Sequence, residues 1–432
     1  MSSLSETSAS GPGGKNLPVV MVLSHPPSPW RAPDWYWNPV AGIPLLLRNI
    51  LTVQRGGVER LILLGENDLT SLDELCQRAA SDSRVRLQLE CLADSKKLTQ
   101  TVDASQGVLF LDGSSLYNKT IIAETLGQAS PGTQSEIFRV LPLDREETDS
   151  FLRQIGATGL SSWLEENLQR QESPVATGAS FNSHRHSRFL TAARTLRITK
   201  EEDFRSLEEQ LIQTCGLSND SFMDQFVTRH ISRQLTRRLI KTSLTPNQIT
   251  LISLAVGLGS AACFLPGSYG TGIIGAGLLL LSAWIDCTDG EVARLKFLES
   301  PFGKKLDIYC DNVVHLAAFF SMGLGLYLST NKIIFIYLGL LAVLGSLVSF
   351  LILGPEIVSQ KTQAAESTPP AAQAKKLSDK LANRDFTYFL FFMALIGRLD
   401  LFLSLTAAGA NIFAGFLLYK KFKPQAATAR GA

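Results

Sequence analysis

Four aspartates lie close together in one of the most apolar parts of the 432-residue sequence. They are Asp286, Asp289, Asp307 and Asp311, within the stretch DCTDGEVARLKFLESPFGKKLDIYCD. The first two are spaced i,i+3 and the last two i,i+4, so each pair shares one face of a helix. If two such helices pack antiparallel, the carboxylates converge, and unpaired carboxylates repel each other strongly at low dielectric. The spacing therefore predicts a cation between them.

The neighbours of these aspartates predict that the cation holds a diphosphate. Oxygen-only ligands suit Mg²⁺ or Mn²⁺, which commonly share their coordination shell with substrate phosphates, and two such ions can clamp a phosphate during in-line displacement. Gly290 and Gly303 leave room for a ligand, and Ala293 is a small residue on the face of Asp289. Arg294 can hold a phosphate bidentately. The stretch thus indicates a metal-bound diphosphate site at a membrane surface.

The same residues form a spaced pattern, Asp286-x-x-Asp289-Gly290-x-x-Ala293-Arg294 followed by Gly303, Asp307 and Asp311. This pattern resembles the signature of the CDP-alcohol phosphotransferases at all of its positions and spacings. The resemblance covers about residues 225–425 and includes LTPNQIT, where Pro246, Asn247 and Thr250 stand as in that family.

The resemblance implies an enzyme of phospholipid synthesis that transfers a phosphoalcohol, expected to be phosphatidyl from CDP-diacylglycerol, to an acceptor hydroxyl and releases CMP. It implies that the metal ligands for Mg²⁺ or Mn²⁺, with two ions expected, are Asp286, Asp289, Asp307 and Asp311. Asp311 would also be the general base that takes the proton of the acceptor. The implied CDP-binding residues are Asp286, Asp289, Gly290, Ala293, Arg294, Gly303 and Asn247.

The acceptor site is less specified. Arg384, in NRDF, would face the same level as the aspartates, and some members of the family use an arginine there for a phosphorylated acceptor. The alternative, a basic residue that merely flanks a membrane span, is slightly favoured. Inositol phosphate, glycerol phosphate, another polyol phosphate and a lipid alcohol all stay open as acceptors.

Long apolar runs after Leu244 predict an all-α membrane domain. Six spans are expected, at about 246–266, 269–287, 306–329, 332–354, 385–399 and 401–420. Basic residues gather in alternate loops, which places both termini and the aspartates at the cytoplasmic face of a cell membrane. The segment 221–241 is expected to be an amphipathic helix on the membrane surface, with Phe226 and Leu235 on its apolar face.

Composition bounds the remaining possibilities. The net charge of +2 and the 19% of charged residues give no case for nucleic-acid binding. The six cysteines are scattered, so neither a disulfide framework nor a zinc site is expected. The polar residues 1–16 lack the apolar core of a signal peptide, which favours a cytoplasmic first domain.

The first half of the chain reads as a doubly wound α/β domain, with strands expected in 17–24, 86–91 and 107–113. NPVAGIPLLLRNILTVQRGGVERLILL resembles the sugar-nucleotidyltransferase fold, in which Asp112 would stand where a metal-binding aspartate is often found. The first loop, SHPPSPWRAPDWYW, departs from that fold, because prolines lack the N–H groups of a phosphate cradle. The lysine expected before PVAG is Asn38. A degenerate cytidylyltransferase-like module is therefore expected.

The expected organisation is a tail (1–16), this α/β domain (17–200), a linker with the surface helix (201–243), the membrane domain (244–424) and a second tail (425–432). One alternative is a bifunctional enzyme whose first domain makes a CDP-alcohol such as CDP-inositol. Another is a non-catalytic membrane scaffold with a relic site, which the intact aspartate set disfavours. A third alternative, a transporter, would need polar residues at mid-membrane depth, whereas here they cluster at one face. The expected partners are the CDP-alcohol, the acceptor, membrane lipids and, by resemblance, a second copy in a homodimer.

Overall fold

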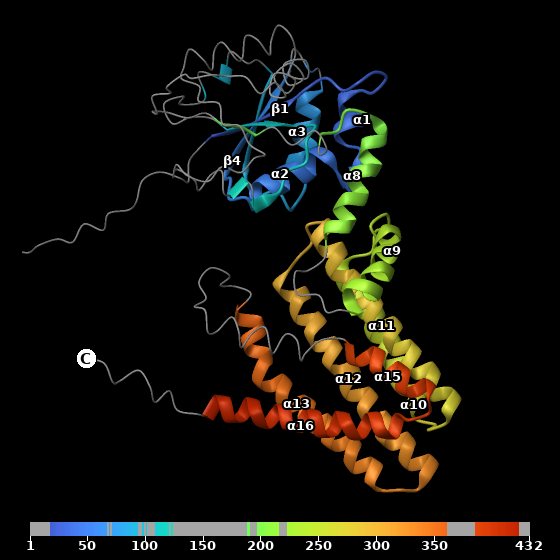
Figure 1. Ribbon diagram of the computed structural model, residues 1–432. Coiled ribbons are helices and arrows are strands. Elements are labelled where there is room, and N and C mark those ends of the chain that lie inside the picture. Colours follow the sequence, from blue (N-terminus) through green and yellow to red (C-terminus); the bar gives the residue numbers. More distant parts are fainter. Residues whose placement is uncertain are drawn as a thin grey trace, which may run out of the picture. The chain divides into compact units, whose positions relative to one another are not determined.

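Short apolar runs rich in Val, Leu and Ile form the strands of the first part of the chain, as their composition predicts. The computed structural model describes residues 18–66, 69, 71–93, 97–98, 101, 109–120, 122–123, 188–190, 197–215, 223–360 and 385–422. The chain divides into two compact units, residues 1–210 and 211–432, and the division falls inside α8 (Glu201–Thr214). Figure 1 shows the elements of both units. The five-part division of the chain expected from the sequence stays a prediction.

The first unit is built on a five-stranded parallel sheet with the strand order β5-β4-β1-β6-β7. Its strands are β1 (Val19–Leu23), β4 (Arg60–Gly65), β5 (Gln88–Leu92), β6 (Leu109–Asp112) and β7 (Arg188–Leu190), and β2 (Pro39–Val40) pairs with β3 (Ile43–Pro44) in a separate antiparallel ribbon. The other helices are α1 (Ala32–Tyr36), α2 (Leu45–Arg55) and α3 (Leu72–Ala80). All five residues of the central strand β1 are buried. The predicted strands are confirmed, whereas helices on both faces of the sheet stay a prediction.

A disulfide joins Cys76 on α3 to Cys91 on β5, so the expectation that no cysteines pair was wrong for these two. Their spacing carries no local motif, because the pairing arises from the packing of α3 beside β5. The described cysteines outside this pair are free thiols.

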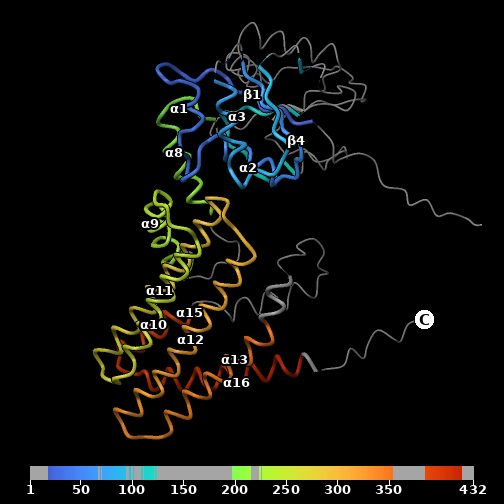
Figure 2. The backbone as a smooth tube through the Cα atoms, turned by 180° about the vertical axis from the view of Figure 1, so that it is seen from behind, coloured from blue at the N-terminus to red at the C-terminus, as the bar shows by residue number. Residues whose placement is uncertain are grey.

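The second unit is helical (Figure 1, Figure 2). After the end of α8, its described elements continue with a π-helical turn, η3 (Asp224–Thr228), and α9 (Arg229–Leu239). The apolar helices are α10 (Pro246–Phe264), α11 (Tyr269–Leu295), α12 (Pro301–Thr330), α13 (Ile334–Gln360), α15 (Asp385–Leu395) and α16 (Leu399–Phe422). Their shared core includes Phe264, Phe319 and Phe402.

Five of these helices are long and apolar enough to cross a membrane, so this is a multi-pass membrane protein. The exception is α15, which at 11 residues is about 16 Å long at about 1.5 Å per residue. The hydrocarbon core of a bilayer is about 30 Å thick, so the sixth span stays a prediction. Where α15 meets α16, an ion pair joins Arg398 Nε to Asp400 Oδ1 across 3.1 Å.

The helices that carry the aspartates are longer than the apolar runs predict. The second and third spans were expected to end at 287 and begin at 306, but α11 continues to Leu295 and α12 begins at Pro301. Hydropathy marks the part of a helix that lies in lipid, and a capped polar extension adds no hydropathy signal. Asp286 and Asp289 therefore lie within α11, two turns before its end.

Candidate functional site

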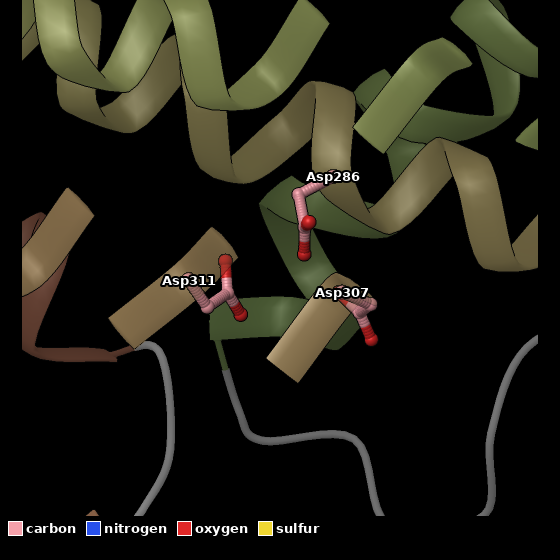
Figure 3. A group of neighbouring side chains, drawn as sticks. All are labelled: Asp286, Asp307 and Asp311. Carbon is pink, nitrogen blue, oxygen red and sulfur yellow. The ribbon is translucent and has the colours of Figure 1, made fainter. Parts of the chain in front are cut away.

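Asp286, Asp307 and Asp311 lie around one common space between α11 and α12 (Figure 3). Each offers a carboxylate oxygen, and these oxygens all lie within 4.8 Å of one another. Asp286 is buried, while Asp307 and Asp311 are half-buried. The predicted convergence of carboxylates is thus observed for three of the four aspartates.

The turn between α11 and α12 sets this geometry. Phe297 takes a left-handed conformation with φ of 56°, and the N–H of Leu298 donates to the carbonyl of Ala293 across 2.9 Å, which closes α11. Ser300 then caps α12 by accepting from the N–H of Gly303 across 2.9 Å, and Pro301 occupies the first helical turn. The short connection leads from the end of α11 directly into the start of α12, and α10 packs against both helices.

The residues fit a divalent cation. Oδ1 of Asp307 is buried and accepts no hydrogen bond from any described residue. A buried carboxylate oxygen without a donor is destabilising, and a bound cation would relieve that penalty. Carboxylate oxygens are also the ligands that Mg²⁺ and Mn²⁺ prefer. The structure thus supports the predicted kind of site, while the number and identity of the ions stay predictions.

Asp289, the fourth aspartate, is buried and held by a different contact. The hydroxyl of Thr250, one turn into α10, donates a short hydrogen bond to Oδ2 of Asp289. Thr250 was noted in the sequence only as part of the start of α10. Its donor role has a sequence signal in retrospect, because a carboxylate placed among apolar residues requires a nearby donor.

We expect Thr250→Val to weaken Mn²⁺ binding about 10- to 100-fold, because losing a hydrogen bond to a ligating carboxylate typically has that effect. Binding can be measured from the signal of free Mn²⁺ in electron paramagnetic resonance. Thr250→Ser, which keeps the hydroxyl, is the matched control and should bind within about threefold of the wild type. Equal Mn²⁺ affinity for Thr250→Val and the wild type would contradict a role for the Thr250–Asp289 hydrogen bond in metal binding.

Two predicted CDP-binding residues meet at the start of α12. A Cβ placed on Gly303 would lie 2.9 Å from Oδ1 of Asn247 and 3.1 Å from Oγ of Ser300. Gly303 therefore leaves room for the Asn247 amide, which comes from the first turn of α10. Their roles toward CDP stay predictions.

The remaining predicted residues of the CDP site line the last turns of α11. Ala293 is buried, and the Arg294 guanidinium lies against Gly290, where a Cβ would be 3.2 Å from Nη1. Nε of Arg294 donates to the carbonyl of Cys215 across 2.8 Å. Burial raises the pKa of the Cys215 thiol to about 11, so the thiol stays protonated at neutral pH. The phosphate-holding role of Arg294 stays a prediction.

Arg384, the candidate for acceptor binding, lies outside the described residues. His315, one turn after Asp311, contacts Phe386 with ring centroids 5.0 Å apart and Phe319 at 6.4 Å. These aromatic contacts suit a histidine that packs within the bundle. Sequence reasoning missed Glu291, which is fully buried between the predicted CDP-site residues.

In the first unit, aromatic side chains occupy the carboxyl edge of the sheet. The strand order reverses at β1, which is where open parallel sheets commonly bind ligands. The Pro-rich loop after β1 forms the short helix α1, whose Trp35 and Tyr36 are fully buried. The hydroxyl of Tyr36 donates to the carbonyl of Ser24 across 2.9 Å. Burial raises the pKa of the Tyr36 phenol, so this side chain stays uncharged at the sheet edge.

Asp112, the residue at the nucleotidyltransferase metal position, is paired with a guanidinium. It is buried at the end of β6, and Nε of Arg197 lies 3.0 Å from its Oδ2. Ser115 Oγ donates to the same oxygen across 2.8 Å, and the N–H of Ser114 donates to Oδ1 across 3.0 Å. Three protein donors thus satisfy this carboxylate.

Comparison with known proteins gives the family of the second unit. The sequence profile of the CDP-alcohol phosphatidyltransferase family matches residues 243–414. A phosphatidylinositol phosphate synthase of Corynebacterium glutamicum is 38% identical over 82 residues, which are 19% of this chain and 36% of that protein. A bifunctional IPC transferase and DIPP synthase of Thermococcus kodakarensis is 34% identical over 126 residues, 28% of each chain. The matched stretches thus span about a third of these relatives.

Among solved structures, the phosphatidylinositol phosphate synthase of Mycobacterium tuberculosis with CDP-DAG bound is 19% identical. The match covers 48% of this chain and 98% of that one, with a TM-score of 0.35. The same enzyme in complex with manganese and citrate also has a TM-score of 0.35. This likeness is weak, and the family assignment rests on the sequence match and its signature residues. Residues 243–414 belong to the CDP-alcohol phosphatidyltransferase family.

Proposed function

We propose that this protein transfers a phosphatidyl group from CDP-diacylglycerol to the hydroxyl of a polyol phosphate and releases CMP. The observation that carries the proposal is the cluster of Asp286, Asp307 and Asp311 within 4.8 Å in a domain of this family. Bound Mg²⁺ or Mn²⁺, with two ions proposed, would neutralise the diphosphate and stabilise the departing CMP. Asp286, Asp289, Asp307 and Asp311 are the residues proposed to hold them.

In the proposed reaction, Asp311 accepts the proton of the acceptor hydroxyl. The acceptor oxygen forms a bond to the phosphorus that carries the diacylglycerol, and the bond from that phosphorus to the bridging oxygen breaks. The electron pair of the broken bond leaves with CMP. Arg294 and the Asn247 amide would orient the diphosphate and the nucleotide, because they come from the turns of α11 and α10 next to the aspartates.

The choice of a polyol phosphate as acceptor is supported by the relatives. The C. glutamicum relative is a phosphatidylinositol phosphate synthase, and an arginine at position 384 is compatible with a phosphorylated acceptor. The proposal includes six membrane crossings with the aspartates on the cytoplasmic side, supported by basic residues in alternate loops. It also includes a homodimer through the membrane domain.

The proposal can be tested with purified full-length protein in liposomes that contain CDP-diacylglycerol and are supplied with Mn²⁺ or Mg²⁺. Inositol phosphate and glycerol phosphate are added as acceptors, and buffer alone is the blank. We expect CMP release that depends on one of these acceptors, with mass spectrometry identifying the lipid product. Absence of CMP release with every acceptor would favour a membrane scaffold.

We also propose that the first unit is a degenerate nucleotidyltransferase module. Two observations support this. Tyr36 packs at the edge of the sheet where such folds bind the nucleotide, and Arg197 pairs with Asp112, the aspartate at the usual metal position. Names of relatives such as the bifunctional T. kodakarensis protein are compatible with a fused module of this kind.

We expect no pyrophosphate release when the purified protein is given CTP, Mg²⁺ and inositol phosphate. The half-buried Arg197 would lose its ion pair with Asp112 in Asp112→Asn, so this variant should unfold at a lower temperature while its CMP release stays that of the wild type. A coupled pyrophosphate assay and a melting curve measure the two effects. Pyrophosphate release that Asp112→Asn abolishes would instead establish the bifunctional alternative.

A further inference from the structure

The juxtamembrane helix α9 turns a polar face toward the helix bundle. Its buried residues are Arg229, Ser232 and Thr236, which follow one another along one side of the helix. On the other side Leu235 is only half-buried, and Phe226 in the preceding turn is 67% exposed. This arrangement agrees with an apolar face that meets lipid, but it requires a polar partner for the buried face.

That partner is the fully buried carboxylate of Glu291 on α11. Arg229 Nη1 donates to its Oε1 across 2.7 Å, and Ser232 Oγ donates to the same oxygen across 2.8 Å. Thr236 Oγ1 donates to Oε2 across 2.6 Å. A buried carboxylate is tolerated where an opposite charge and several donors compensate for its lost hydration. One side chain therefore fastens two turns of α9.

Glu291 lies on a different side of α11 from the metal-site carboxylates. At about 100° per residue, it is roughly 200° around the helix from Asp289 and about 140° from Asp286. Glu291 is thus placed to contact α9 on the face of α11 away from Asp286 and Asp289, and not to bind the metal. Figures 1 and 2 show α9 beside this end of α11.

Two further side chains of the same helix end hold the segment on either side of α9. Arg294 Nε donates to the carbonyl of Cys215, before the helix. Lys296 is buried, and its Nζ donates to the carbonyl of Thr242, after the helix, across 2.7 Å. The last turns of α11 are therefore attached to the segment 215–242 at its start, middle and end.

The turn before α9 has an additional attachment. Thr228 Oγ1 lies 2.9 Å from the hydroxyl of Tyr388 on α15, and Trp284 Nε1 on α11 donates to that same hydroxyl across 2.9 Å. Trp284 is two residues before Asp286. Contacts on both sides of Asp286 and Asp289 thus link α11 to the segment that holds η3 and α9, on one side through Tyr388 and on the other through Glu291.

We propose that Glu291 is a positioning residue for the transfer reaction, which fixes α11 against the juxtamembrane helix so that the aspartates and Arg294 keep their places. The inference rests on the proposed function. A displacement of about 1 Å in a reacting geometry can lower a rate about 100-fold, which is the scale of effect that loss of this anchor would have. The juxtamembrane segment is accordingly part of the active-site support and not only a membrane anchor.

The test compares Glu291→Ala, Glu291→Gln and the wild type in liposomes with CDP-diacylglycerol and Mn²⁺. We expect kcat for CMP release per folded protein to fall about 10- to 100-fold in Glu291→Ala, with KM for CDP-diacylglycerol changed less than about threefold. Glu291→Gln should recover part of kcat, because its amide oxygen can still accept from Ser232 or Thr236. Arg238→Ala, an exposed arginine of the same helix, is the matched control and should behave as the wild type.

Amide hydrogen exchange tests whether Glu291 holds the juxtamembrane segment, and it does not depend on the transfer reaction. The amides of 223–242 should exchange about tenfold faster in Glu291→Ala than in the wild type or in Arg238→Ala. Slow exchange in Glu291→Ala, or a kcat per folded protein equal to that of the wild type, would overturn the proposal. If the wild type released no CMP but Glu291→Ala still exchanged faster than the wild type, the anchoring role of Glu291 would stand and the proposed function would fail. Equal losses of kcat and of folded protein would reduce Glu291 to a purely structural residue.

Discussion

Replacing Asp311 by Asn will lower CMP release from CDP-diacylglycerol about 10²- to 10⁴-fold, the usual contribution of a general base. Asp311 is half-buried on α12, with a carboxylate oxygen within 4.8 Å of those of Asp286 and Asp307. It is one turn further along α12 than Asp307, so it can reach an acceptor that approaches the clustered carboxylates. Asn keeps the shape of the side chain but takes up a proton far less readily.

Two comparisons separate the base from a simple metal ligand. In Asp311→Asn, kcat should fall much more than the Mn²⁺ concentration needed for half-maximal rate rises. Glu299→Gln, an exposed carboxylate in the turn between α11 and α12, is the matched control and should keep the wild-type rate. An unchanged rate in Asp311→Asn would refute its assignment as the base.

The site was predictable because its information is local. Asp286, Asp307 and Asp311 lie on two helices consecutive in the sequence, and helical spacing places Asp307 and Asp311 on one face of α12. The capping signals at Ser300 and Pro301 were also visible in the sequence, yet the hydropathy of the span dominated the expected helix limits. The strands of the first unit were found for a similar reason, since short apolar runs bounded by turn residues report directly on burial.

What was missed depends on contacts between distant segments. Cys76 and Cys91 pair through the packing of α3 on β5, which no spacing rule reports. Arg229 lies in the segment 221–241 that was expected on the membrane surface, but it is buried against Glu291, 62 residues away along the chain. The general lesson is that an ionisable residue inside an apolar stretch predicts a partner, although the sequence alone leaves that partner unnamed.

The tyrosine at the sheet edge shows the same limit. The Pro-rich loop predicts that a phosphate cradle is missing, because proline has no N–H to donate. That the loop would fold into α1 and place Tyr36 beneath the carboxyl edge of β1 was not visible, since its burial depends on the contact with Ser24 at the end of that strand.

Removing divalent cations will abolish CMP release, and adding Mn²⁺ or Mg²⁺ will restore it. The clustered carboxylates repel one another and the substrate diphosphate, so neither can be held without a compensating charge. CMP release should fall below detection after treatment with a chelator and return in proportion to the cation added back. Binding to the folded state also stabilises it, so Mn²⁺ should raise the melting temperature of the wild type.

The increase in melting temperature provides a readout that needs no substrate. It should be lost in Asp307→Asn, because the buried Oδ1 of Asp307 accepts no hydrogen bond from the described residues and would gain from a cation. It should persist in Glu299→Gln, whose carboxylate is exposed and outside the cluster. An equal Mn²⁺-induced shift in Asp307→Asn and the wild type would place the cation elsewhere, whereas chelator-resistant CMP release would exclude a metal-dependent transfer altogether.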